Sequence, residues 1–271
     1  MTWKVILQNL WEVLTMINLI KAELFKLKRN RIFWVLIGVV TFIYGLANYL
    51  VIIDWWKMYN TGFYNIGLKE YNAMEMVKLP LIFNLIISTL AGFFINIDYT
   101  TGTIKNQILS GNKRSHIYLA KLIVFSLGSV ITAVILPLMT VIFETTFLGH
   151  SDIYTSERVL YLLRAFSLYT LIIIAYSSII MMIASITKES GKTIIITIIM
   201  TIILFVIDKS LIFKNELVRT IYENTIFYQI HRAFNSSITS NEIGKNIVIS
   251  IATFIIISFC GSSIFKKQEI K

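Results

Sequence analysis

The sequence is poor in charge: only 15% of its 271 residues are Asp, Glu, Lys or Arg, whereas 56% are hydrophobic. A soluble domain carries roughly 25% charged residues. The shortfall comes from long stretches without Asp, Glu, Lys, Arg or His. A helix of about 20 such residues crosses the hydrocarbon core of a bilayer. The composition therefore excludes a soluble enzyme and indicates an integral membrane protein.

Groups that carry chemistry are also scarce. Cys260 is the single cysteine, so no disulfide framework is possible, and the three histidines show no metal-ligand spacing. The apolar stretches hold no acid, base or histidine of the kind that ion-coupled transporters place within the membrane. We therefore expect no catalytic, metal-binding or cofactor-binding residues in this chain. A membrane enzyme acting on lipid or peptide lacks a candidate catalytic cluster.

Six charge-free runs predict an all-α, polytopic membrane bundle of six transmembrane helices. The runs are 32–53, 79–97, 122–143, 165–186, 193–207 and 247–265. The run 193–207 rises only about 22 Å as a helix, so it is expected to span, with a re-entrant hairpin as the alternative. The transmembrane domain thus covers 32–265. An amphipathic segment, 1–31, precedes it, and a short cytoplasmic tail, 266–271, follows it.

The basic residues are unevenly distributed between the two sets of alternating segments outside the runs. The segments 1–31, 98–121, 187–192 and 266–271 hold 15 Lys and Arg in 67 residues. The intervening segments, 54–78, 144–164 and 208–246, hold 10 in 85 residues. By the positive-inside rule the first set is cytoplasmic, and so are both termini. Because the charges flank apolar spans, nucleic-acid binding is not expected.

Residues 3–27 carry apolar side chains at helical spacing and predict an amphipathic helix in the plane of the lipid headgroups. A cytoplasmic extension is the alternative, and Met16 could also be the native start. At the other side of the membrane, the segment 208–246 is too apolar for a linker. It predicts short helices that rest on or dip into the outer leaflet.

The basic segment 98–121 contains a predicted docking element. Gly102 and Gly111 bracket a short helix, Thr103 to Leu109. Its basic surface is assigned to Lys105, Lys113, Arg114 and Lys121, and its apolar edge to Ile104, Ile108 and Leu109. A short helix on a cytoplasmic loop suits the docking of a soluble partner. An ordinary basic connector is the alternative.

A partial nucleotide-binding motif occurs at 186–193, which reads ITKESGKT. The P-loop pattern requires glycine where Ile186 stands, and it requires a preceding strand. Here a 22-residue apolar run precedes it. We therefore reject nucleotide binding and interpret Thr187 to Lys192 as a tight turn between two helices.

Two segments resemble the permease subunits of type-2 ABC exporters, in particular the bacterial drug- and peptide-resistance branch that includes the bacitracin and lantibiotic self-protection permeases. Residues 20–36 are similar to the amphipathic lead-in of that family. The lead-in residues are Glu23, Lys26, Lys28, Arg29 and Arg31. The run from Asp98 to Lys105 is similar to the coupling segment, acidic-Tyr-x-x-Gly-Thr-x-Lys. The matching residues are Asp98, Tyr99, Gly102, Thr103 and Lys105, followed by Leu109, Arg114, Tyr118 and Lys121. The family often has glutamate where this chain has Asp98.

The resemblance implies a separate ABC ATPase subunit that binds ATP, docked at the coupling segment, and a dimer of permeases, identical or paired with a sister subunit. It implies export of a peptide, an antibiotic or another amphipathic substrate, and hence antibiotic resistance or peptide immunity. A non-transporting partner or sensor subunit in the membrane is the second interpretation. Substrate, direction of movement and choice of permease partner stay open.

Overall fold

The computed structural model describes residues 3–52, 80–147, 156–210, 216–235 and 238–269, and in these ranges every regular element is a helix. In chain order they are α1 (Trp3–Arg29), α2 (Arg31–Ile52), α5 (Pro80–Phe94), α6 (Ile97–Thr100), α7 (Thr103–Leu109), α8 (Arg114–Phe147), α9 (Ser156–Thr187), α10 (Ser190–Ser210), α11 (Glu216–Glu223), α12 (Ile226–Ala233) and α13 (Ser240–Lys267). The predicted all-α fold class is confirmed.

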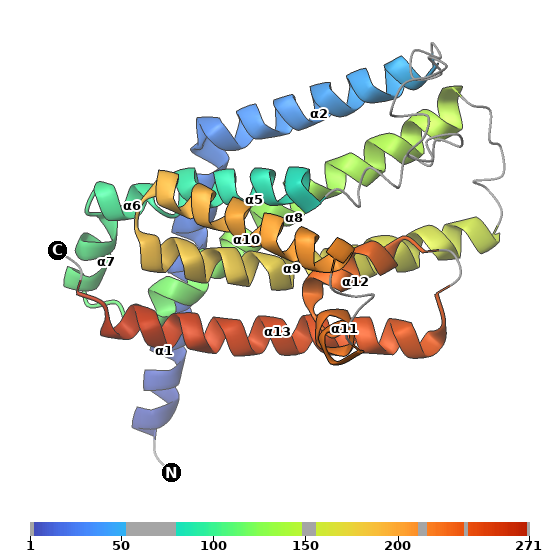
Figure 1. Cartoon of the computed structure of the whole chain (residues 1–271). Helices are drawn as coiled ribbons and strands as arrows, with labels where there is room; N and C mark the ends of the chain where they lie inside the picture. The colour runs from blue at the N-terminus through green and yellow to red at the C-terminus, as the bar shows by residue number, and fades with distance from the viewer. Residues whose placement is uncertain (1–2, 53–79, 148–155, 211–215, 236–237, 270–271) are drawn as a thin grey trace.

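The long helices lie side by side along one axis, and α1 crosses them (Figure 1). The helices α6 and α7, the C-terminal end of α13 and the turn between α9 and α10 gather at one end of the bundle, which we call the α7 end. The basic segments 98–121 and 187–192 and the tail of α13 therefore share one end, as the charge pattern predicts. That this end faces the cytoplasm stays a prediction.

Four described helices are long and apolar enough to cross a membrane, namely α8, α9, α10 and α13. The bent pair α1–α2 makes a fifth candidate if it is counted as one broken span. The helix in the predicted span 79–97, α5, has 15 residues, and its start adjoins 53–79, which lies outside the described residues. The chain is a multi-pass membrane protein, whereas the count of six spans stays a prediction.

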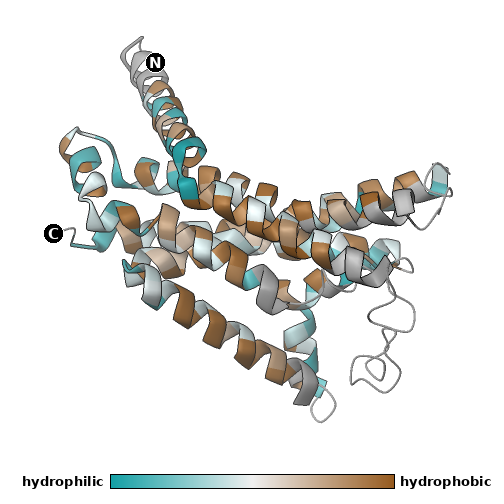
Figure 2. Cartoon of the chain, turned by 90° about the horizontal axis from the view of Figure 1, so that it is seen from above, coloured by the Kyte–Doolittle hydropathy of each residue, from teal (hydrophilic) through white to brown (hydrophobic). Residues whose placement is uncertain are grey.

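The helices α8 and α9 form the centre of the bundle. In their apolar windows 53% and 56% of the surface is buried, against 17% in α10 and 22% in α13. Many of the exposed side chains of α10 and α13 are large and hydrophobic, and brown residues recur along the long helices in Figure 2. Hydrophobic side chains on the outside are the arrangement expected for contact with lipid.

Uncharged polar side chains join the spans, and hydrogen bonds of this kind are common between helices within a bilayer. The Asn84 amide of α5 donates to the Thr197 carbonyl of α10 at 2.8 Å and accepts from the Tyr176 hydroxyl of α9 at 2.5 Å. Ser126 of α8 and Ser177 of α9 share a hydrogen bond of 2.6 Å. These contacts fix α5, α8, α9 and α10 relative to one another.

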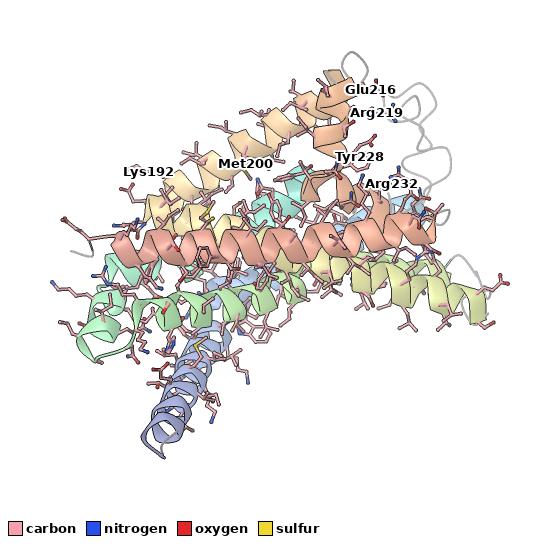
Figure 3. All side chains as sticks on the ribbon, turned by 90° about the horizontal axis from the view of Figure 1, so that it is seen from below. Lys192, Met200, Glu216, Arg219, Tyr228 and Arg232 are labelled. Atoms are coloured by element: carbon pink, nitrogen blue, oxygen red, sulfur yellow. The ribbon has the colours of Figure 1, made fainter. Side chains whose placement is uncertain are left out.

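The turn between α9 and α10 is short, as predicted. α9 ends at Thr187, Lys188 adopts a left-handed backbone with φ of 57°, and α10 begins at Ser190. Helix α10 therefore extends three residues beyond each end of the run 193–207, which gives it the length to span that the run alone lacked. Lys192 lies at one end of α10, far from Arg219 of α11 (Figure 3).

The predicted short helices in 208–246 are α11 and α12. The ring of Phe227 in α12 packs edge-on against Tyr176 of α9, with ring centroids 5.5 Å apart. Tyr176 lies 11 residues from the end of α9 at Thr187, about 16 Å along the helix. Helix α12 therefore reaches well into the bundle rather than resting on its surface.

Candidate functional site

Four charged side chains from three helices meet inside the α7 end. They are Glu23 and Lys26 of α1, Asp98 of α6 and Lys121 of α8. The Lys121 ammonium lies 2.7 Å from a Glu23 carboxylate oxygen, and the Lys26 ammonium lies 2.6 Å from the other. Both ammonium groups also contact the same carboxylate oxygen of Asp98. We call these four residues the charge cluster.

The charge cluster is nearly dry. Exposed fractions of the side chains are 1% for Lys121 and 3% for both Glu23 and Asp98, whereas Lys26 keeps 31% and forms the edge of the cluster toward water. Two acids face two bases, so the formal charge is zero. Burial disfavours the Glu23 carboxylate, but the nearby ammonium groups of Lys121 and Lys26 outweigh it and hold the pKa of Glu23 below its ordinary value.

Local sequence explains how the cluster forms. Glu23 and Lys26 are three residues apart on α1, so they share one helix face. Lys121 follows Ile117 by four residues and precedes Phe125 by four, and both of these are buried on the same face of α8. A lysine in such a row can keep its charge only if acids lie opposite it.

Helix α7 contacts the bundle through two apolar side chains, Ile104 and Ile108, and one amide. Ile104 is fully buried, and the Gln107 amide donates to Glu23 of the charge cluster at 3.1 Å. Gly102 has a φ of 69° and nothing within 4 Å of the position a Cβ would take. Glycine is needed there for its backbone conformation rather than for space. The predicted helix bounds, Thr103 to Leu109, are confirmed.

The surface of α7 differs in part from the prediction. Lys105 is exposed, as expected. Leu109 is 75% exposed and so does not belong to the apolar edge with Ile104. Lys121 is buried in the charge cluster, where its ammonium forms ion pairs with Glu23 and Asp98. It therefore does not contribute to a basic surface. The assignment of Lys121 to that surface was therefore wrong.

Arg114, which was predicted to lie on the docking surface, holds the end of α13, and its part in docking stays a prediction. Its guanidinium donates to the carbonyl oxygens of Lys266 at 2.9 Å and Gln268 at 2.6 Å. The Gln268 amide in turn donates to the Ser185 carbonyl of α9 at 3.0 Å. Cationic donors suit the free carbonyls at a helix C-terminus. Arg114 thus links the start of α8 to the last turn of α13 at the α7 end of the bundle.

Replacing Arg114 by alanine is expected to free the last turn of α13. Hydrogen bonds from charged donors contribute about 1.5–3 kcal/mol, so amide hydrogen exchange over 264–269 should become roughly ten-fold faster or more. The matched control is Lys113→Ala, which removes a neighbouring cation whose partner, Glu12, is also solvent-accessible. Equal protection of 264–269 in both variants would show that Arg114 does not hold this end.

Aromatic packing explains the place of Tyr99. Its ring meets Phe265 of α13 edge-on at 6.5 Å, and Phe265 also packs on Tyr118 of α8 at 5.8 Å. Gly261 lies so close to the Tyr118 hydroxyl that a Cβ there would overlap it. The coupling-like segment is therefore joined to α13 as well as to α1 and α8. Within the described part of the chain, the Thr103 hydroxyl makes a local hydrogen bond of 2.8 Å to Thr101.

The remaining lead-in residues lie outside the charge cluster. Lys28, Arg29 and Arg31 are exposed around the break between α1 and α2, whereas Glu23 and Lys26 point into the bundle. Among the described residues, no group of three His, Cys, Asp or Glu is placed to hold a metal ion.

A family profile described as ABC-2 family transporter protein matches residues 19–204, which is more than half of the chain and includes all four residues of the charge cluster. The chain belongs to the ABC-2 family of transporter proteins. It is a permease, the membrane subunit of an ABC transporter, and not a catalytic subunit. A search of curated proteins gives no significant match to this permease.

Sequence reasoning missed three features of the permease. It named Glu23, Lys26, Asp98 and Lys121 separately but did not bring them together. It also overlooked Gln107, which links α7 to the cluster, and the contact of Tyr118 with Gly261. The buried row Ile117–Lys121–Phe125 was the one local signal that could have revealed the cluster.

Proposed function

We propose that this permease is the membrane subunit of an exporter that moves a peptide, an antibiotic or another amphipathic substrate out of the cell or its membrane. In this proposal the α7 end faces the cytoplasm, together with both termini. An ABC ATPase docks on α7 and supplies the energy. The permease acts as a dimer, either of identical chains or with a sister subunit.

The observation that carries the proposal is the joining of an exposed helix to a buried ionic core. Lys105 on the outer side of α7 is free to meet a partner, whereas Ile104 and Gln107 on its inner side fix the helix to the bundle. A force on α7 therefore reaches the charge cluster directly. The cluster in turn holds α1 and α8, and α8 packs on α9, α2 and α13 in the centre of the bundle.

A buried cluster with several ion pairs is suited to transmitting a movement of α7 to the bundle. Each ammonium contacts two carboxylates, so sliding α6 past α1 or α8 would separate buried opposite charges. Separation of that kind is costly in a low-dielectric interior. The segments α1, α6, α7 and the start of α8 are thus expected to move as one body when the ATPase moves α7.

The substrate class rests on the resemblance of 20–36 and 98–121 to peptide- and drug-resistance permeases. It can be tested by co-expressing the permease and its ATPase in a peptide-sensitive bacterium. We expect higher inhibitory concentrations for bacitracin or a lantibiotic, and unchanged values for a small hydrophilic antibiotic. The control is the same permease with a hydrolysis-deficient ATPase. Unchanged inhibitory concentrations across the peptide panel would reject this substrate class and favour a sensor or partner subunit.

A further inference from the structure

We propose that the bend between α1 and α2 binds the headgroup of an acidic glycerophospholipid. Three cations, Lys28, Arg29 and Arg31, lie exposed within four residues there. None of them forms an ion pair with any residue in the described ranges of the chain. The neighbouring acids Glu23 and Asp98 already form ion pairs with the lysines of the charge cluster.

The bend is held in shape by groups other than the three cations. Asn30 accepts hydrogen bonds from the amides of Ile32 at 2.9 Å and Phe33 at 3.3 Å, and so caps the start of α2. Its own amide donates to the Phe93 carbonyl of α5 at 3.2 Å. The Trp34 indole donates to the Lys28 carbonyl at 2.8 Å. The three cationic side chains thus project from a fixed backbone and have no ion-pair partner among the described residues.

The depth of the bend in the bilayer indicates that its ligand is a lipid headgroup. The exposed apolar face of α2 begins at Trp34 and Val35, which are 56% and 60% exposed, and continues toward Leu46. Arg31 precedes Trp34 by three residues, about 4.5 Å along the helix. The headgroup layer is about 5–7 Å thick on each side of the hydrocarbon core. The three cations therefore lie at the level of the lipid phosphates rather than out in the cytoplasm, where the ATPase would lie.

The outer face of α1 has the composition of an interfacial surface. Apolar and cationic side chains alternate along it at helical spacing, and the exposed ones include Leu14, Ile17, Lys21, Phe25 and Lys28. The Arg29 guanidinium stacks on the Phe25 ring at 4.6 Å. With α1 bent by 56° from α2, this face can rest on the bilayer while the bend holds a headgroup. A zwitterionic headgroup brings its own cation, so an acidic headgroup matches three unpaired cations better.

The site can be tested with the full chain in nanodiscs that contain spin-labelled lipid. Each cation near an anionic surface contributes about five-fold to association, so with three cations we expect at least about five-fold stronger association with phosphatidylglycerol than with phosphatidylcholine. Lys28→Gln, Arg29→Gln and Arg31→Gln together should reduce the ratio to near one. Because these side chains are exposed and unpaired, circular dichroism should show an unchanged helix content.

The matched control neutralises three other exposed lysines, with Lys245→Gln, Lys266→Gln and Lys267→Gln, and should keep the preference. Equal association of the two lipids with the wild type, or equal loss in both triple variants, would overturn the proposal. Loss of the preference on adding inorganic phosphate, but not chloride at the same ionic strength, would also overturn it in favour of a free-phosphate site. The inference rests on the membrane location of the chain, so its failure would leave the proposed docking of an ATPase untouched.

Discussion

Replacing Lys121 by methionine is expected to destabilise this permease by about 3–5 kcal/mol, the usual cost of removing one partner of a buried ion pair. Methionine fills a similar volume, so the change in charge dominates. Without the ammonium, Glu23 and Asp98, each 3% exposed, share only Lys26 at the edge of the cluster. One buried negative charge is then uncompensated. A lower midpoint of thermal unfolding in detergent would measure the loss.

A second variant separates the effect of the charge cluster on stability from its effect on coupling between the permease and the ATPase. Combining Lys121→Met with Asp98→Asn restores formal neutrality and keeps the Glu23–Lys26 pair at 2.6 Å. We expect the double variant to regain much of the stability but to lack the ionic link between α6 and α8. The activity of the ATPase bound to this variant should then no longer respond to substrate.

The control is Lys192→Met at the same end of the bundle. The ion pair of Lys192 with Glu189 is solvent-exposed and so contributes below about 1 kcal/mol. A double variant no more stable than Lys121→Met would show that the two charges are not coupled.

Reversing the charge at Lys105 is expected to uncouple the permease without unfolding it. Loss of one desolvated charge contact at an interface costs about 2–5 kcal/mol, which weakens ATPase association roughly thirty-fold or more. The side chain is exposed in the isolated chain, so Lys105→Glu should insert and fold normally. Co-purification of the ATPase and substrate-stimulated hydrolysis should both fall. The matched reversal, Lys245→Glu in the first turns of α13, removes an equally exposed cation and should change neither.

The bounds of α7 could be predicted from sequence because they depend on local backbone chemistry. Gly102 and Gly111 adopt φ of 69° and 84°, a left-handed conformation that glycine accepts readily and that interrupts a helix. The spans could be predicted for a similar reason, since a bilayer admits only long apolar helices. In both cases the necessary information lies within a few consecutive residues.

The charge cluster could not be predicted in the same way, because it depends on which helices become neighbours. Glu23 and Lys121 are 98 residues apart, and Lys26 and Asp98 are 72 apart. Hydrophobic periodicity says which face of a helix is buried but not what it is buried against. Lys121 was grouped with Lys105 and Arg114 because they are close in sequence. In the structure Lys121 lies in the charge cluster, Lys105 lies on the exposed surface of α7, and Arg114 lies at the end of α13.

The claim that α7 is the docking element for an ABC ATPase can be tested directly by photo-crosslinking. The residue p-benzoylphenylalanine is introduced in place of Lys105 in the full-length permease co-expressed with its ATPase, and separately in place of Lys245 at the opposite end of the bundle. We predict a covalent adduct with the ATPase from position 105 and none from position 245. No adduct from position 105, or equal adducts from both positions, would contradict it.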